Sequence, residues 1–133
     1  MKTTGDILDK LYPALNVSSV TNTITGRVYR RKKPLNSQLE DIEIVILPID
    51  NGEGYDTQHA TAIINAYAKN HDNGQPNETR LKAMAAAIIA AIEALAVTGM
   101  YFETQIETES IMQDPDDPLM SYESLRVYCT IES

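Results

Sequence analysis

The first residues of the chain place apolar side chains at helical spacing. These apolar positions recur every three or four residues, at Ile7, Leu8, Leu11 and Leu15. Thr3 followed by Asp6 fits a capping box, in which a hydroxyl and a carboxylate satisfy free backbone N–H groups. The pattern therefore predicts a short N-terminal helix. Pro13 should end or kink it near Tyr12, because proline lacks the N–H that a helix interior uses.

From residue 24 the period changes from that of a helix to that of a strand. Residues 24–31 alternate between two faces, with Arg27, Tyr29 and Arg31 on one of them. A polar loop, 32–38, follows, and then the strongest strand signal of the chain at 41–47, where every second residue from Ile42 is isoleucine. Because the two strands are neighbours in the sequence, we expect them to form an antiparallel hairpin.

The middle of the chain predicts a third strand and a long helix. Residues 60–69 alternate as a strand does, although their alanines would equally suit a helix. Asn77 is a plausible N-cap for a helix from Glu78 to about Thr98, with Gly99 at its C-terminal end. An apolar stripe runs along this helix, at Leu81, Met84, Ile88, Ile92 and Leu95.

The far side of the long helix carries alanines in place of charges, at Ala83, Ala86, Ala87, Ala90, Ala91 and Ala94. An ordinary surface helix has a polar back. We therefore expect a helix covered on two sides, or covered on one side and closely approached by another subunit on the other. An equally good interpretation is that alanine is simply the best helix former. Ala86, Ala87 and Ala90 are candidate subunit-interface residues.

Two closing strands complete the predicted fold. Residues 101–109 and 124–131 alternate as half-buried strands do, and between them lies an acidic loop, Asp114 to Pro118. The order is helix, three strands, helix, two strands. This order predicts a single α+β domain over residues 1–133, with an antiparallel or mixed sheet of about five strands, a short N-terminal helix and one long helix packed on it.

Composition narrows the class of protein. The chain has 133 residues, with 43% hydrophobic and 23% charged side chains and a formal charge of −8. These values suit one acidic globular domain and argue against a surface built throughout to hold nucleic acid. The N-terminus carries acids where a signal peptide needs an apolar run. The longest uncharged apolar run, Ala83 to Ile92, has ten residues, too short for a membrane span. We expect an intracellular protein.

Candidate catalytic and metal-binding residues are few. His59 and His71 lack the spacing of a zinc site. The strand pattern around Cys129 predicts that its thiol is buried and structural. Acids gather at Asp50–Asp56 and Asp114–Asp117 without the spacing of a calcium-binding loop, so solvated turns explain them better. No phosphate-binding glycine motif occurs. We expect no catalytic residue, cofactor or metal.

Charge distribution is more informative than any motif. Five of the eleven bases fall within seven residues, at Arg27, Arg30, Arg31, Lys32 and Lys33. From Tyr101 to the end of the chain there are eight acids and one base, Arg126. One basic patch and one acidic end suit head-to-tail self-association, so these five bases are candidate subunit-interface residues. A solvated basic loop explains the run about as well, and a nucleic-acid contact explains it less well.

One stretch of the sequence resembles a known family. Gly26-x-x-Tyr29-Arg30, then Pro34, Ser37 and Glu40-Asp41-Ile42-x-Ile44, resembles the early hairpin of small tail-completion (tail-terminator) proteins of long-tailed bacteriophages and prophages. The order of elements that follows is also similar, so that the resemblance covers most of the chain. It rests on a spacing of common residues and on element order.

The resemblance implies an α+β protein that assembles as a ring, commonly a hexamer, which caps the tail tube and joins it to the head connector. It implies a structural protein of the virion tail, assembled in the bacterial cytoplasm, with tail-tube and head-connector proteins as partners. DNA would pass through the ring without specific binding, which suits an acidic lumen formed by the C-terminal region.

Two other classes of function remain open. A small acidic intracellular binding protein, such as an immunity-type inhibitor or an adaptor, fits the size and charge equally well and the basic run less well. A small enzyme on an α+β scaffold is the third alternative. Neighbouring tail-tube and portal-type genes would favour the tail protein, whereas a toxin gene would favour the inhibitor.

Overall fold

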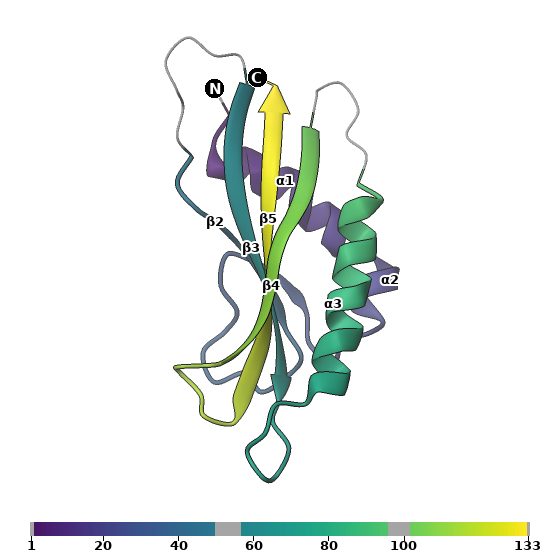
Figure 1. The fold of residues 1–133 in the computed structure, drawn as a ribbon, viewed down its shortest axis with the longest axis vertical. Coiled ribbons are helices and arrows are strands. Elements are labelled where there is room, and N and C mark those ends of the chain that lie inside the picture. The colour runs from purple at the N-terminus through teal and green to yellow at the C-terminus, as the bar shows by residue number, and fades with distance from the viewer. Residues whose placement is uncertain (1, 50–56, 96–101, 133) are drawn as a thin grey trace.

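The protein is built on one five-stranded mixed sheet. The structure, a computed structural model, describes residues 2–49, 57–95 and 102–132. The strands are β1 (Val28–Arg30), β2 (Ile42–Ile46), β3 (Thr57–Lys69), β4 (Phe102–Gln113) and β5 (Met120–Glu132), in the order β1-β2-β3-β5-β4. Helices α1 (Thr4–Leu15), α2 (Ser18–Thr21) and α3 (Glu78–Glu93) pack on one face of the sheet (Figure 1). The predicted α+β fold is confirmed.

The core lies between the helices and this face of the sheet. The sheet contributes residues that alternate along each strand, among them Ile42, Ile44, Ile64, Leu125 and Val127. The helices contribute an apolar stripe each, including Leu8, Leu11, Leu81, Met84 and Ile88. No helix in the described part of the chain covers the other face of the sheet, which we call the open face. Cys129 is buried in this core, as predicted, and burial raises the pKa of its thiol to about 12.

Helix α1 begins as predicted and ends later than predicted. The capping box is present, with the Asp6 N–H donating to Thr3 Oγ1 at 3.3 Å and the Thr3 N–H donating to Asp6 Oδ2 at 2.6 Å. Pro13 lies inside the helix, which continues to Leu15. A proline in the last turn removes one backbone hydrogen bond, and the burial of Leu15 in the core holds that turn in place.

The expected hairpin of the first two strands is wrong. β1 pairs with β2 in parallel, with Val28 opposite Ile42 and Arg30 opposite Ile44. It is also shorter than the predicted 24–31. The chain leaves β1 at Arg31, whose φ of 76° lies in the left-handed region. The loop up to Asp41 then carries the chain back alongside β1, so that β2 starts at the same end.

The other strands are confirmed, with one irregularity at the sheet edge. β2, β3, β5 and β4 pair antiparallel in that order of neighbours. In β4 the register against β5 shifts between Ile106 and Thr108, which leaves Glu107 as an extra residue. A bulge of this kind exchanges the two faces of the strand. Ile106 and Glu109 therefore both share the helix-covered face with their partners Val127 and Leu125.

Helix α3 is shorter than predicted, and the described residues cover only one of its sides. Asn77 caps it by accepting from the Arg80 N–H at 3.3 Å, and it ends at Glu93 rather than near Thr98. Gly99, the predicted stop, lies outside the described residues. Four positions of the predicted stripe, Leu81 to Ile92, are buried, and the fifth, Leu95, is half-buried beyond the helix end. The alanine side stays largely open: Ala83, Ala86 and Ala90 are exposed and Ala87 is half-buried. Cover by another element of the chain is thus wrong, and approach by another subunit stays a prediction.

A carboxyl group is buried where β5 passes between β3 and β4. Glu123 is 4% exposed and lies opposite Ala66 and Ile111. Burial, and next a hydrogen bond with Glu109, raise the pKa of Glu123 to about 8. The folded protein therefore keeps a proton that the unfolded chain releases near pH 4.5. The contribution of Glu123 to stability therefore falls as pH rises from about 4.5 to about 8.

The burial of Ile88 predicts a large loss of stability on truncation. Ile88→Ala should lower the free energy of unfolding by roughly 2–5 kcal/mol, because the cavity adds to the lost transfer energy. Lys82→Ala, at an exposed position of the same helix, should change it by about 0.5 kcal/mol or less. Urea unfolding of both variants tests this. Equal midpoints would show that α3 does not dock through this stripe.

The Glu123 pair predicts a specific pH dependence. In Glu123→Gln the buried side chain is neutral at every pH, whereas in wild type its carboxyl group is destabilised by burial once the unfolded state can ionise. The stability of this variant relative to wild type should therefore rise progressively from pH 5 to pH 8. Glu107→Gln removes the same charge from an exposed position of β4 and should follow the wild-type profile. Melting temperatures across this range measure the difference. Parallel profiles for all three proteins would contradict the buried carboxyl pair.

Candidate functional site: a basic sheet edge

The five clustered bases lie at one edge of the sheet: Arg27 directly precedes β1, Arg30 ends it, and the other three lie in the loop that follows. Their side chains do not form one continuous patch. Two of them turn to helix α1: Arg30 Nη2 lies 2.9 Å from Asp9 Oδ1, and Arg31 Nη2 donates to Thr4 Oγ1 at 3.3 Å. The Arg30 guanidinium also lies 5.9 Å from the centre of the Tyr12 ring. These contacts are solvent-exposed, so they orient the arginines more than they stabilise the fold.

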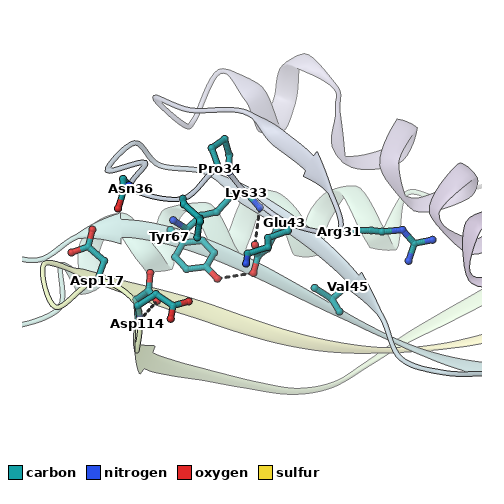
Figure 2. Close-up of a pocket in the computed structure, with 12 residues that line it drawn as sticks. Arg31, Lys33, Pro34, Asn36, Glu43, Val45, Tyr67, Asp114 and Asp117 are labelled. Carbon is teal, nitrogen blue, oxygen red and sulfur yellow. Dashed lines mark hydrogen bonds between the residues drawn. The ribbon is translucent and has the colours of Figure 1, made fainter.

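Lys33 is held against the open face of the sheet (Figure 2). Its backbone N–H donates to Glu43 Oε2 at 3.0 Å, and its Nζ lies 4.7 Å from the centre of the Tyr67 ring. Glu43 also accepts from the Tyr67 hydroxyl at 2.6 Å and from Asn65 Nδ2 at 3.2 Å. Burial raises the pKa of Tyr67 above its ordinary value. The hydroxyl therefore stays protonated and remains a donor to Glu43.

The loop of Lys33 faces acids of its own chain. A pocket of about 270 Å³ separates this loop from the Asp-rich loop, Asp114 to Pro118 (Figure 2). Bases and acids line opposite sides of the pocket, among them Lys32, Lys33, Asp114, Asp116 and Asp117. Gln38 Nε2 reaches across to Asp117 Oδ2 at 3.5 Å. Part of the acidic C-terminal region therefore faces bases of its own chain. The sequence did not reveal this contact, because the two loops lie far apart along the chain.

The start of the basic segment is fixed by a close backbone approach, which we call the Gly26–Asp41 clasp. Asp41 is fully buried, and its carboxylate accepts from the Arg27 N–H at 3.1 Å and from Ser37 Oγ at 2.5 Å. A Cβ at Gly26 would lie 2.0 Å from Asp41 Oδ1 and 2.7 Å from the Glu40 carbonyl oxygen. Only glycine leaves room for this approach. The clasp sets where β1 meets β2.

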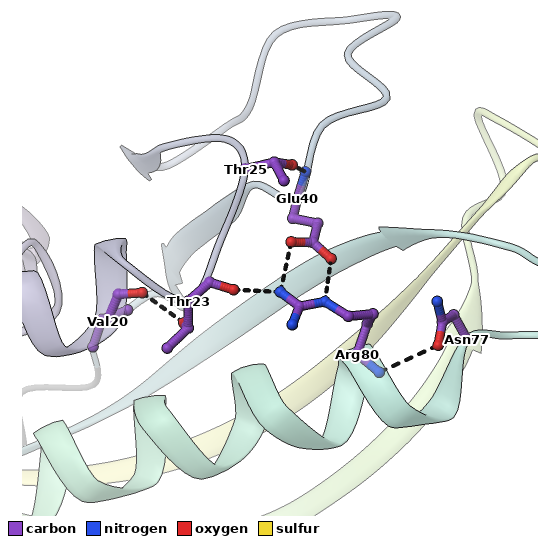
Figure 3. A network of polar contacts seen from close by, with 6 residues as sticks. All are labelled: Val20, Thr23, Thr25, Glu40, Asn77 and Arg80. Carbon is purple, nitrogen blue, oxygen red and sulfur yellow. Dashed lines mark hydrogen bonds and ion pairs between the residues drawn. The ribbon is translucent and has the colours of Figure 1, made fainter.

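An ion pair ties the same region to α3 (Figure 3). Arg80 Nε and Nη2 donate to the two oxygens of Glu40, both at 2.7 Å, and Nη2 also donates to the Thr23 carbonyl. The Glu40 N–H donates to Thr25 Oγ1 at 2.9 Å. Hydrogen bonding to Glu40 raises the pKa of Arg80. A bidentate pair of this kind has defined geometry, so it fixes the residues before β1 and β2 relative to the helix.

Sequence reasoning missed four residues that hold the basic edge in place: Asp41, Glu43 and Tyr67, which contact the basic segment, and Arg80, which pairs with Glu40. One signal was available for Arg80, because a base in the first turn of a helix opposes the helix dipole and calls for a partner. Glu43, a lone acid in an otherwise apolar strand, was a second signal. Of the five bases, Arg27 and Lys32 remain exposed, and in the described part of the chain their side chains have no hydrogen-bond or ion-pair partner.

Three further C-terminal acids lie on β4, at the opposite edge of the sheet. β4 carries Glu103, Glu107 and Glu109 and no base. The C-terminal end of α3 lies beside β4, where Ile92 and Leu95 line a hollow together with Thr104 and Ile106. The exposed Ala86 and Ala90 precede this hollow along α3. One edge of the sheet is therefore basic and the other acidic.

The described residues contain no group of three or more His, Cys, Asp or Glu side chains placed to hold a metal ion. Within the same residues no helix is both long and apolar enough to cross a bilayer. His59 and His71 are both exposed, and the His59 ring stacks on Tyr128 at 5.4 Å between ring centres.

The clasp predicts that Gly26 does not tolerate a side chain. Gly26→Ala should lower the free energy of unfolding by about 1–3 kcal/mol or more, because the added carbon displaces Asp41 or Glu40. Gly5→Ala is a matched control in α1, where the nearest atom to the added Cβ is 3.6 Å away. This control should be neutral or stabilising, since alanine favours helices. Equal urea midpoints for the two variants would contradict the clasp.

Comparison with known proteins gives a match in structure alone. No family model and no curated protein matches this sequence. Among solved structures, the fold is similar to that of a chain in the virion of a native gene transfer agent (GTA) particle, with a TM-score of 0.67. The match covers 98% of this chain and 98% of that chain at 13% sequence identity. The two chains share a fold over their whole lengths.

Proposed function

We propose that this protein is a structural component of a phage-type virion. The observation that carries the proposal is the similarity in fold to a chain of a GTA virion, with a TM-score of 0.67. The match covers 98% of each of the two chains. The sequence of residues 26–44, which resembles that of tail-completion proteins, points in the same direction. Such a role requires no catalytic residue, metal or cofactor.

Within the virion we assign the protein to the tail, as a homo-oligomeric ring that caps the tail tube and joins it to the head connector. A basic edge and an acidic edge on opposite sides of one sheet support a head-to-tail arrangement of identical subunits. Heterologous contacts of this kind give closed rings when the rotation between neighbours closes, and a hexamer is the size that the family resemblance implies. The exposed side of α3 around Ala86, Ala87 and Ala90 would lie near the same contact.

The charge of the chain suits a ring through which DNA moves. At −8 overall, the assembled ring repels phosphates and offers them no continuous binding surface. The basic side chains do not contradict this, because Arg30, Arg31 and Lys33 are engaged by other parts of the chain. The protein would be made in the bacterial cytoplasm and remain in the tail of the finished particle.

Capping of tail tubes tests the proposal. Purified protein mixed with tail tubes from phage-type particles of the same host should form rings at tube ends, visible by electron microscopy. Raising the salt concentration should slow capping, because screening weakens steering between charged surfaces. Lys32→Glu should slow it at low salt. Lys69→Glu makes the same charge change at an exposed end of β3 and should not.

Two outcomes would contradict the proposal. Protein that never binds tube ends, at any concentration or salt, is not a tail-completion protein. Protein that stays monomeric and instead binds a basic partner tightly would favour the small acidic inhibitor or adaptor.

A further inference from the structure

Strand β4 is a long and open edge. It has twelve residues, and within the described part of the chain it pairs with β5 alone, so the backbone groups along its other side have no strand to bind there. Native sheets shield such edges with charges, prolines or bulges, because an open edge is a template for another strand. β4 has this protection in its first half, where Glu103, Glu107 and the bulge lie.

The second half of β4 lacks this protection. After the bulge, Ser110, Ile111, Met112 and Gln113 carry no charge, and Ile111 and Met112 are 39% and 48% exposed. The one acid in this half, Glu109, is hydrogen-bonded to the buried Glu123. Exposed apolar side chains on both faces of an unpaired strand are features of a surface that receives a partner.

We propose that the edge of β4 over Thr108–Gln113 pairs with the β1 edge of a second copy of this chain, so that the sheet continues from subunit to subunit. This inference rests on the proposed ring and names its contact. β1 is the other edge strand of the same sheet, and the two unpaired bases, Arg27 and Lys32, flank it. Glu107 stands exposed at the start of the β4 segment. The two edges are therefore complementary in backbone and in charge.

Pairing of β4 with β4 of another copy is disfavoured. Antiparallel pairing of Thr108–Gln113 with the same segment of another copy would place Glu107 of one chain opposite Asp114 of the other, and like charges on adjacent strands destabilise pairing. Such a contact is also isologous, so it closes as a dimer and leaves both β1 edges unused. Pairing of β4 with β1 uses both edges of every subunit. It is the arrangement that a closed ring requires.

Amide hydrogen exchange measures the pairing directly. The backbone amides of Thr108–Gln113 should exchange more slowly in the oligomer than in the monomer, whether the oligomer forms in concentrated solution or on tail tubes. Amides of β3 provide the internal control, because this central strand is already paired on both sides and should not change.

Charge exchange identifies the partner strand. Glu107→Lys alone and Lys32→Glu alone should each weaken self-association about tenfold or more in sedimentation velocity, because each juxtaposes like charges. Both positions are exposed, so the variants should keep the wild-type circular dichroism spectrum. The double variant, Glu107→Lys with Lys32→Glu, restores opposite charges across the contact. It should recover association to within about threefold of wild type.

The outcomes separate this inference from the proposed function. If wild-type protein caps tubes while Thr108–Gln113 gains no protection, or the double variant associates no better than the single ones, the β4–β1 contact is wrong and the tail role stands. Protection and rescue in a solution oligomer that never binds tubes would support the contact and overturn the tail role. Absence of association under every condition would overturn both.

Discussion

The arrangement of this protein depends on one buried carboxylate, that of Asp41. Its oxygens accept hydrogen bonds from the Arg27 backbone and the Ser37 hydroxyl, and the absence of a side chain at Gly26 lets the two backbone segments meet around it. A buried charge is costly unless it is hydrogen-bonded. Moving either segment would remove a donor from the Asp41 carboxylate, so this cost holds both segments in position. They are the start of β1 and the end of the loop before β2, and the clasp therefore specifies that these strands run in parallel.

The parallel pairing decides what each sheet edge presents. Because β2 starts beside β1, the intervening loop must travel the length of β1 outside the sheet. It packs over the open face, where Lys33 meets Glu43 and Tyr67 and faces the Asp-rich loop. This leaves Arg27 and Lys32 as the free bases at one edge, while the acids of β4 mark the other. The bidentate pair of Glu40 and Arg80 then fixes the whole edge to α3.

Much of the fold could be predicted from periodicity. The capping box at Thr3, the buried isoleucines of β2 and the stripe of α3 follow local rules of spacing and capping, and all are confirmed. Strand direction could not be predicted, because it depends on contacts between Gly26 and Asp41 that no local pattern reveals. The residues that carry the family resemblance include Gly26, Ser37, Glu40 and Asp41. The structure gives each of them a contact in the clasp or in the ion pair beside it.

The candidate site was predicted in part, for the same reason. The run of bases from Arg27 to Lys33 is visible in the sequence, but its division among α1, the open face and solvent is a consequence of tertiary structure. The most direct test of the account is a structure of the assembled oligomer, obtained by electron cryomicroscopy at a resolution that traces strands. We predict a ring in which β4 of each subunit lies beside β1 of the next, with Glu107 near Lys32 or Arg27 of the adjacent copy. An assembly in which the β4 edge faces solvent would contradict it.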